Sequence, residues 1–286
     1  MLTLQATSIA NLRDLGGSQL VGGRVVRSGL VFRSGQLDRF APEMDEVAAG
    51  LRLGTIVDLR TEAERGARPD RVPAGARYVV ADVVADLMAG EPAGSDPGAD
   101  GPFTVTLDEL LADPVAAERQ LEGGRVVRRF ESTYRALVSS DSARDAYRIL
   151  LTELARPEAG PLLFHCAAGK DRTGWAAVLL LGLLGADEAA ITREYLSIGP
   201  ALRQTYQPVI DRYLAGGGRL ESILALTGVR TEYLAAALDE VARRHGSMAG
   251  YVRDGLGVPD ATVTALVERL TEPAHPRGTS STLLYP

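Results

Sequence analysis

The sequence contains very little cysteine and histidine, the residue types that most often build metal sites and redox centres. Its single cysteine, Cys166, excludes an intramolecular disulfide and any cluster of cysteine ligands. The histidines at 165, 245 and 275 are too far apart in sequence to match a metal-ligand spacing. We therefore expect no metal and no cofactor, and the lone thiol fits a reducing compartment.

The chain also lacks an excess of basic residues and any long hydrophobic run. Its 286 residues carry 31 Lys and Arg against 37 Asp and Glu, a formal net charge of -6. That balance argues against a general nucleic-acid binder, which needs a clustered basic face. No apolar run approaches the roughly 18 residues of a transmembrane helix, and residues 1–7 lack a signal-peptide pattern. We expect a cytoplasmic protein without membrane insertion, with secretion by a non-classical route left open.

What the chain has instead is an alternation of short β-rich runs and helical patterns. Apolar, β-branched runs bounded by Gly and Pro predict buried parallel strands at 30–33, 55–59, 77–81 and 161–165. Helical patterns lie at 42–51 and 130–154, and almost all of 174–270 is predicted to be helical. This alternation predicts an α/β fold, with helices on both faces of a short, mostly parallel sheet.

Two segments depart from this pattern. Residues 82–124 form an acidic insertion, dense in Pro, Gly and Asp around 91–98, which predicts a solvated loop or, alternatively, a flap beside the site. Residues 273–286 are polar and proline-containing and predict a C-terminal tail. We expect residues 1–272 to form a single domain.

The most informative stretch is residues 165–174, which read HCAAGKDRTG. It follows the fourth predicted strand and precedes the apolar helix expected from residue 175. At such a junction, successive backbone N–H groups and the partial positive charge of the helix N-terminus form a cradle for an anion. Gly169 and Gly174 allow backbone angles and a close approach that a side chain would obstruct.

Cys166 and Arg172 are separated by five residues of this loop, so both can address one phosphate. The loop amides and Arg172 favour a thiolate at neutral pH, and the guanidinium fork can hold two phosphoryl oxygens. We therefore expect Cys166 to attack phosphorus and form a cysteinyl phosphate that water then hydrolyses. The simpler interpretation, a buried cysteine acting as a small hydrophobe, does not explain the charged residues that follow it.

These residues resemble the signature of the Cys-based protein tyrosine phosphatase superfamily, and the ending KDRTG resembles its bacterial branch, which has mycobacterial members. The resemblance extends to 11–17, 32–35, 58–64, 228–234 and 250–254, and it is weakest across 85–124 and 197–226. It implies a protein-tyrosine-phosphatase-like fold with a helical lid at 197–228. It also implies activity on phosphotyrosine, with phosphoserine, phosphothreonine and phosphoinositides as further substrates.

The loop and the resemblance together supply a set of candidate site residues. The expected catalytic residues are Cys166, Arg172 and Asp171. The loop residues expected to bind the substrate phosphate are Ala167, Ala168, Gly169, Lys170, Thr173 and Gly174. Within this set, Lys170 could meet a second phosphate, Thr173 is expected to hydrogen-bond the sulfur, and His165 is expected to orient the loop.

The proton donor for the leaving oxygen is left open between two positions. Asp171 is favoured, because it lies beside Arg172 and lipid-directed relatives carry an aspartate there. Asp86, or with less support Asp82, follows the third predicted strand, where other tyrosine phosphatases carry a mobile acid loop. For Asp86 a solvated loop carboxylate is the simpler interpretation.

Other functions remain as alternatives. A small-molecule phosphatase for a phosphoinositide, a sugar phosphate or a nucleoside monophosphate would use the same loop, because the loop reads only the phosphate. A phosphate-binding protein without catalysis is disfavoured by the intact Cys166, Asp171 and Arg172. Arsenate reduction or sulfur transfer generally needs resolving cysteines, which this sequence lacks. We expect a phosphorylated protein or small molecule as the partner.

Overall fold

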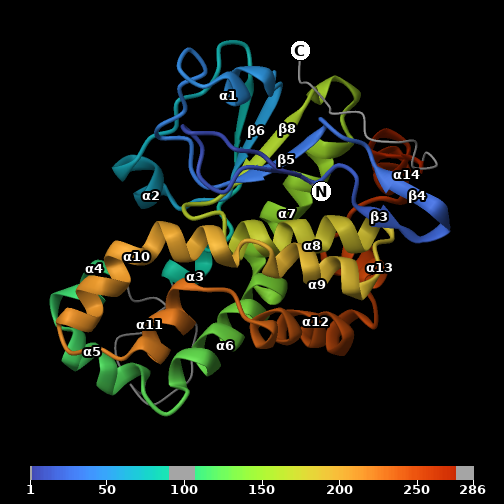
Figure 1. Ribbon diagram of the computed structural model, residues 1–286. Coiled ribbons are helices and arrows are strands. Elements are labelled where there is room, and N and C mark those ends of the chain that lie inside the picture. The colour runs from blue at the N-terminus through green and yellow to red at the C-terminus, as the bar shows by residue number, and fades with distance from the viewer. Residues whose placement is uncertain (1, 90–106, 275–286) are drawn as a thin grey trace.

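The fold contains a mixed six-stranded sheet in the order β1-β2-β5-β8-β6-β7, whose strands β5, β8 and β6 are labelled in the upper half of Figure 1. The computed structural model describes residues 2–89 and 107–274. Strands β5, β8, β6 and β7 are parallel to one another, whereas β2, near one edge, is antiparallel to both of its neighbours, β1 and β5. Their bounds are Leu2–Thr3 (β1), Arg13–Asp14 (β2), Val31–Ser34 (β5), Thr55–Asp58 (β6), Arg77–Val80 (β7) and Leu162–His165 (β8). The four predicted strands and the mostly parallel sheet are confirmed.

The central parallel strands are buried on both faces, because alternate residues enter different hydrophobic clusters. Val31 and Phe164 belong to the larger cluster, and their neighbours Phe32 and Leu163 belong to the smaller one on the opposite face. Two buried faces explain why these strands are continuous apolar runs in the sequence rather than alternating ones.

Helices cover both faces of the sheet, as the sequence predicts, but unevenly (Figure 1). Helix α1 packs on the smaller cluster through Ala48, while α8 lies on β5 and β8 and contacts α6 and α9. Helix α8 is apolar on all sides and almost wholly buried, which suits a helix at the centre of a core. The longer helices are Glu46–Gly50 (α1), Glu62–Ala67 (α2), Ala85–Ala89 (α3), Leu107–Ala112 (α4), Pro114–Leu121 (α5), Arg125–Ser139 (α6), Asp141–Ala155 (α7), Asp171–Leu184 (α8), Glu188–Leu196 (α9), Gly199–Ala215 (α10), Leu220–Thr227 (α11), Thr231–His245 (α12) and Asp260–Leu270 (α14).

The prediction of one continuous helix over 130–154 is wrong. Helix α6 ends at Ser139 and α7 begins at Asp141. Between them Ser140 adopts an extended conformation, and its hydroxyl accepts a hydrogen bond from the amide of Ala143, so it caps α7. The prediction over 42–51 is also too long, because Asp45 caps α1 and the helix starts after it.

A small antiparallel sheet ties the end of the helical half to the N-terminal region. Strand β9 (Thr271–Pro273) pairs with β4 (Arg24–Val26), which pairs with β3 (Gln19–Leu20). Short helical segments complete the described chain: Val21–Gly23 (η1), Pro157–Ala159 (η2), Met248–Gly250 (α13) and Tyr251–Gly255 (η3). Within the described ranges, no helix combines the length and hydropathy needed to cross a membrane.

The segment predicted as an acidic insertion, 82–124, contributes α3, α4 and α5 where it is described. Its acidic centre at 91–98 lies outside the described residues, as do residues 275–286 of the expected tail. Helices α4 and α5 lie beside α10 and α11 at the lower left of Figure 1.

Asp45 fixes the segment that precedes β2. Its carboxylate accepts hydrogen bonds from the amides of Thr7 and Ser8 at 2.8 Å each, from the Ser8 hydroxyl at 2.7 Å and from the Ala48 amide at 3.1 Å. Burial acts to raise the pKa of Asp45, but these hydrogen bonds outweigh it and lower the pKa to about 2. The carboxylate thereby anchors residues 7 and 8, which line the cleft described below.

We predict that Asp45→Asn lowers the free energy of unfolding by about 1–2 kcal/mol at pH 7. Because the folded pKa lies below the unfolded value near 3.9, this contribution is present above about pH 4 and is lost as the pH falls toward 2. Thermal unfolding from pH 7 to pH 2 checks this: the gap between wild type and variant should close with falling pH. Glu46→Gln, at the exposed neighbouring position, is the control. A gap that is constant with pH contradicts the role of the charge.

Candidate active site

The stretch 165–174 forms a tight loop between β8 and α8. Strand β8 ends at His165, and α8 starts at Asp171. Gly169 has a φ of +70°, and a Cβ there would lie 2.5 Å from the carbonyl oxygen of Ser34. Both the angle and the space therefore require glycine at this position. Gly174 lies inside α8, where a Cβ would make only ordinary contacts of 3.5 Å or more.

Three carbonyl groups of this loop are held from outside. The carbonyl of Ala167 accepts a hydrogen bond from the amide of Gln36 at 3.1 Å, that of Ala168 from the side-chain amide of Asn11 at 2.8 Å, and that of Gly169 from Nη2 of Arg33 at 2.8 Å. A trans peptide points its C=O and the following N–H in opposite directions. The N–H groups of residues 168, 169 and 170 therefore point away from these three partners.

Arg33 links the loop to α9, and the neighbouring buried Arg13 binds the residue that follows this helix. Arg33 pairs through Nη1 with Glu194 at 2.7 Å, and Arg13 donates to the hydroxyl and carbonyl of Ser197 at 2.6 and 2.7 Å. Burial and the neighbouring charge of Arg33 lower the pKa of Arg13 to about 10, although Glu194 opposes the shift. Two guanidinium groups thus share one carboxylate behind the loop, which leaves an excess of positive charge there.

Arg172 is held by Glu64 of α2. Its Nη1 and Nη2 each lie 2.6 Å from one carboxylate oxygen of Glu64, a bidentate pair that fixes the plane of the guanidinium. Burial disfavours the charged form, but Glu64 and the nearby Cys166 outweigh it, so the pKa of Arg172 lies above its ordinary value. Burial likewise acts to raise the pKa of Glu64, and Arg172 lowers it below the usual range.

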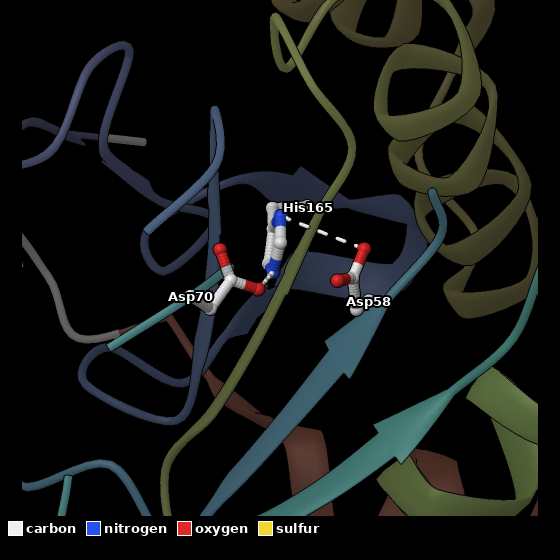
Figure 2. A group of neighbouring side chains, drawn as sticks. All are labelled: Asp58, Asp70 and His165. Atoms are coloured by element: carbon white, nitrogen blue, oxygen red, sulfur yellow. Dashed lines mark ion pairs between the residues drawn. The ribbon is translucent and has the colours of Figure 1, made fainter. Parts of the chain in front are cut away.

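His165 contacts two buried aspartates, Asp58 and Asp70 (Figure 2). Together with Arg60 they form a buried cluster of charged side chains. Its Nε2 lies 3.0 Å from Asp70, and its Nδ1 lies 3.2 Å from the carbonyl oxygen of Cys166 and 4.0 Å from Asp58. Arg60 lies 2.7 Å from a carboxylate oxygen of each of these aspartates. His165, Asp58 and Asp70 are close enough together to hold a metal ion, but Arg60 already supplies a cation to both carboxylates.

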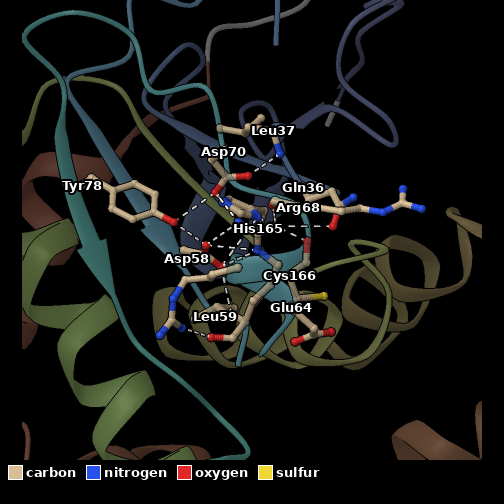
Figure 3. Close-up of polar contacts among 12 residues, drawn as sticks. Gln36, Leu37, Asp58, Leu59, Glu64, Arg68, Asp70, Tyr78, His165 and Cys166 are labelled. Carbon is tan, nitrogen blue, oxygen red and sulfur yellow. Dashed lines mark hydrogen bonds and ion pairs between the residues drawn. The ribbon is translucent and has the colours of Figure 1, made fainter. Parts of the chain in front are cut away.

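The same cluster also includes Tyr78 of β7 and contacts the backbone of Arg68 at the end of α2 (Figure 3). The hydroxyl of Tyr78 donates to Asp58 and lies 3.2 Å from a carboxylate oxygen of Asp70. Arg60 donates to the carbonyl of Arg68 at 2.7 Å. Burial acts against the ionised form of Asp58, but Arg60 outweighs it and the pKa of Asp58 falls well below its usual range. The cluster therefore holds His165 and the backbone of Arg68 in fixed positions.

Cys166 is buried, with 3% of its surface exposed, at the start of the loop. Tyr206 of α10 lies near it: burial and then the charges of Asp171 and Cys166 raise the pKa of Tyr206 to about 12. Thr173 is fully buried, and its hydroxyl makes no hydrogen bond with any described residue, the Cys166 sulfur included.

Asp171 ends a chain of two buried tyrosines. The hydroxyl of Tyr195 donates to that of Tyr134 at 2.8 Å, and Tyr134 donates to Oδ1 of Asp171 at 2.9 Å. Lys170 lies 3.7 Å from the other oxygen, Oδ2. The Lys170 ammonium is buried, donates to the carbonyl of Leu226 at 2.6 Å and sits 4.6 Å from the ring centre of Phe130. In this arrangement it is engaged with α11 rather than free to meet a phosphate.

The two carboxylates after β7 differ in environment. Asp86 is exposed and accepts hydrogen bonds from the amide and the hydroxyl of Ser142 at the start of α7. Burial acts to raise the pKa of Asp86, but Ser142 outweighs it and lowers the pKa. For Asp82 burial prevails and raises the pKa, although the nearby Arg172 and Arg65 oppose it. Asp82 is thus the one of this pair that is shifted toward holding a proton.

A cleft of about 680 Å³ opens beside the loop, within the usual size of ligand sites. Its walls come from the N-terminal segment, the turn after β5, the helices α2 and α10, and the loop itself. The lining residues are Ala6, Thr7, Ser8, Ile9, Ala10, Asn11, Gln36, Asp38, Arg39, Glu64, Ala67, Arg68, Ala167, Ala168, Leu202, Thr205 and Tyr206.

Comparison with known proteins agrees with this architecture. The chain is 32% identical over 256 residues to a Cupriavidus necator protein provisionally named as a tyrosine-protein phosphatase, covering 88% of this chain and 83% of that one. It is 29% identical over 279 residues to the triple specificity protein phosphatase PtpB of Mycobacterium tuberculosis, covering 90% and 94%. The fold and these likenesses define a phosphoric monoester hydrolase. A model described as the tyrosine phosphatase family matches residues 4–272, and the chain belongs to that family.

Several residues around the loop have roles that the sequence did not reveal. Asn11, Arg33 and Glu64 fall in stretches that resemble the family, yet their spacing gives no sign of their partners. Each contacts a loop residue more than 100 positions away in sequence. One signal was present for Asn11: asparagine is among the few residues that adopt positive φ readily, and here its φ is +57°.

We predict that Glu64→Gln lowers kcat/KM about 10- to 100-fold, because a freed guanidinium loses its fixed plane. Glutamine can still complete the capping box that Glu64 forms with Thr61, so α2 should persist. Glu62→Gln, on an exposed position of the same helix, serves as the matched control and should stay within about 2-fold of wild type. Equal losses in both variants, or none in Glu64→Gln, would contradict the assigned role. Steady-state kinetics on an aryl phosphate supply the measurement.

Proposed function

We propose that this phosphatase hydrolyses phosphotyrosine, with Cys166 as its nucleophile. The observation that carries the proposal is the set of three outward-held carbonyls at 167, 168 and 169, which turns the following N–H groups to the other side of the loop. N–H groups oriented together, at the N-terminus of a long helix, form an anion site. Cys166 stands at the start of that site.

The chemistry follows from these positions. The Cys166 thiolate attacks phosphorus, the bond from phosphorus to the phenolic oxygen breaks, and a cysteinyl phosphate forms. Arg172 is held end-on by Glu64 through Nη1 and Nη2, which leaves the edge formed by Nε and Nη2 for two phosphoryl oxygens. Water then attacks phosphorus, and the thiolate leaves.

We assign the proton donor to Asp171. Its Oδ1 accepts a hydrogen bond from Tyr134 at 2.9 Å, while Oδ2 has only the longer 3.7 Å contact with Lys170. In this proposal Oδ2 is the oxygen that carries the proton to the leaving phenolate. After the first step the same carboxylate takes a proton from the attacking water. Asp86 is a weaker candidate, because its carboxylate is engaged at the start of α7 and its pKa is lowered.

The cleft suits an aromatic substrate. Tyr206 and Leu202 of α10 form an apolar wall beside the loop, against which a phosphotyrosine ring can pack. Activity beyond phosphotyrosine is also proposed, since one relative carries the name triple specificity protein phosphatase. The lid predicted at 197–228 corresponds to α10 and α11, and we propose that this pair covers the site within a single phosphatase domain.

The proposed lid is linked to α5 by a buried carboxylate. Glu118 accepts hydrogen bonds from the hydroxyl of Tyr213 at 3.0 Å, the amide of Arg219 at 3.0 Å and the hydroxyl of Ser222 at 2.5 Å. It thereby caps the start of α11 from a distant helix. Helices α5, α10 and α11 are held together by this residue, so any lid movement should involve all three.

A substrate panel in EDTA tests the function. We expect the highest kcat/KM on phosphotyrosine peptides, lower values on phosphoserine peptides and phosphoinositides, and no dependence on added metal. Cys166→Ser should lower turnover at least about 1,000-fold. Retained turnover in Cys166→Ser refutes the nucleophile. Appreciable kcat/KM for only one small molecule, such as a sugar phosphate or a nucleoside monophosphate, refutes the protein-phosphatase proposal.

The leaving group tests the acid. Phenolate needs a proton to depart, whereas 4-nitrophenolate departs with little help. We predict that Asp171→Asn lowers kcat about 100-fold or more for phenyl phosphate and far less for 4-nitrophenyl phosphate. Tyr134→Phe should show the same selectivity at about 3- to 10-fold, because it positions Asp171. Asp86→Asn is the comparison: if it shows this leaving-group signature and Asp171→Asn does not, Asp86 is the donor.

A further inference from the structure

Two arginines line the cleft without a part in the catalytic chemistry. Arg39 follows β5 in the turn that leads to α1, and Arg68 caps the end of α2. Both line the same cleft as Ala167 and Ala168 of the loop. We propose that Arg39 and Arg68 form a second anion subsite, which binds a carboxylate near the phosphotyrosine of a protein substrate.

The position of Arg68 is fixed although its side chain is exposed. Its backbone carbonyl accepts from Arg60 at 2.7 Å, and its amide donates to the carbonyl of Glu64 at 3.0 Å. Figure 3 shows the Arg68 side chain extending away from the buried cluster. The charge cluster that supports His165 therefore also presents Arg68 at the cleft. A guanidinium anchored at its base loses less freedom when it binds an anion.

The charges that face this part of the cleft leave it positive. The lining acids are Asp38 and Glu64, and Glu64 is occupied by its bidentate pair with Arg172. Arg39 and Arg68 are thus set against Asp38 alone, in a protein whose net charge is -6. A local positive region on an acidic protein favours an anionic partner at that place.

Asp38 of this chain forms a weak ion pair with Arg68 at the place where we expect a substrate carboxylate to bind. Its carboxylate lies 3.9 Å from Nη1 of Arg68, and the two side chains are 21% and 63% exposed. Exposed pairs at this distance contribute little, so a substrate carboxylate with better geometry can replace Asp38. Among the described residues Arg39 makes no ion pair within 4.0 Å, and its exposed side chain lines the same cleft.

The subsite fits an acidic side chain better than a multiply phosphorylated headgroup. A carboxylate carries one negative charge and matches the bidentate fork of a guanidinium. A second phosphate would bring nearly two charges next to Asp38, with only two exposed arginines to balance them. The cleft continues from the loop to these arginines, so a residue close to the phosphotyrosine in sequence can reach them.

The test rests on the proposed phosphotyrosine activity and compares two peptides. One carries glutamates on both sides of the phosphotyrosine, and the other carries glutamines at the same positions. We expect the wild-type protein to prefer the acidic peptide about 3- to 10-fold in kcat/KM, mainly through KM, at low ionic strength. The preference should decline at 0.5 M salt. Comparing both peptides within each variant cancels any change in turnover that they share.

The proposed subsite predicts that some variants lower the preference for the acidic peptide and that another raises it. Arg39→Ala with Arg68→Ala should reduce the preference to about 1, whereas Asp38→Asn should increase it about 2- to 3-fold by removing the competing carboxylate. The single variants Arg39→Ala and Arg68→Ala should each lower the preference, and Arg203→Ala is their control, because it removes the same single charge from an exposed site on α10 that does not line the cleft. It should leave the preference unchanged. Because a partly unfolded protein would lose turnover on both peptides alike, a folding defect cannot produce the higher preference expected for Asp38→Asn.

The outcomes separate the subsite from the function. Turnover of both peptides without an arginine-dependent preference overturns the subsite and leaves the phosphatase assignment intact. Absence of turnover on any phosphotyrosine peptide overturns the function itself, and the subsite with it. An equal loss in Arg203→Ala means that long-range charge, not the subsite, sets the preference. An arginine dependence found with phosphoinositide vesicles and not with the peptides also contradicts the proposal.

Discussion

The outward bracing of the loop carbonyls is the interaction on which the site depends. The amide of Gln36, the side chain of Asn11 and the guanidinium of Arg33 each take one carbonyl of the loop. Without these partners the peptide groups would be free to rotate, and their N–H groups would not converge on one anion. The bracing also explains Gly169, since only a residue without a Cβ fits against the backbone of Ser34 at this φ.

The arginines at the loop are each paired with a carboxylate. Each guanidinium that reaches the loop is held from its far side by a carboxylate: Glu194 holds Arg33, and Glu64 holds Arg172. An arginine buried without such a partner would be costly and poorly oriented, whereas a paired one presents a defined edge to the loop. Near the end of β8, Arg60 pairs with Asp58 and Asp70, the two aspartates beside His165. The guanidinium groups of Arg33 and Arg172 are thereby held in place at the loop that carries Cys166, the proposed nucleophile.

The sequence predicts what is local and misses what is distant. The four strands and the loop could be read because each is a contiguous run with its own turn signals, and Cys166 and Arg172 belong to one such run. The partners of the loop could not, since Asn11, Arg33, Glu64 and Tyr134 come from four separate elements that only the folded chain brings together. Lys170 shows the same limit: a cation in the loop suggests a phosphate ligand, yet here its ammonium is buried against Leu226 and Phe130. The break at Ser140 could be read from the sequence, because residues 139–142 are the polar run Ser-Ser-Asp-Ser and serine is a common N-cap residue.

The most direct test of the central claim is to trap the intermediate. Turnover of an aryl phosphate is stopped with acid after a few milliseconds, and the digested protein is analysed by mass spectrometry. A nucleophilic Cys166 predicts that the peptide containing this residue gains the mass of one phosphoryl group, and that Cys166→Ser shows no such gain during the same interval. Two results would contradict the claim that Cys166 is the nucleophile. One is full turnover with the phosphoryl group on another residue. The other is full turnover with no phosphorylated peptide in repeated quenches of both the wild type and Asp171→Asn.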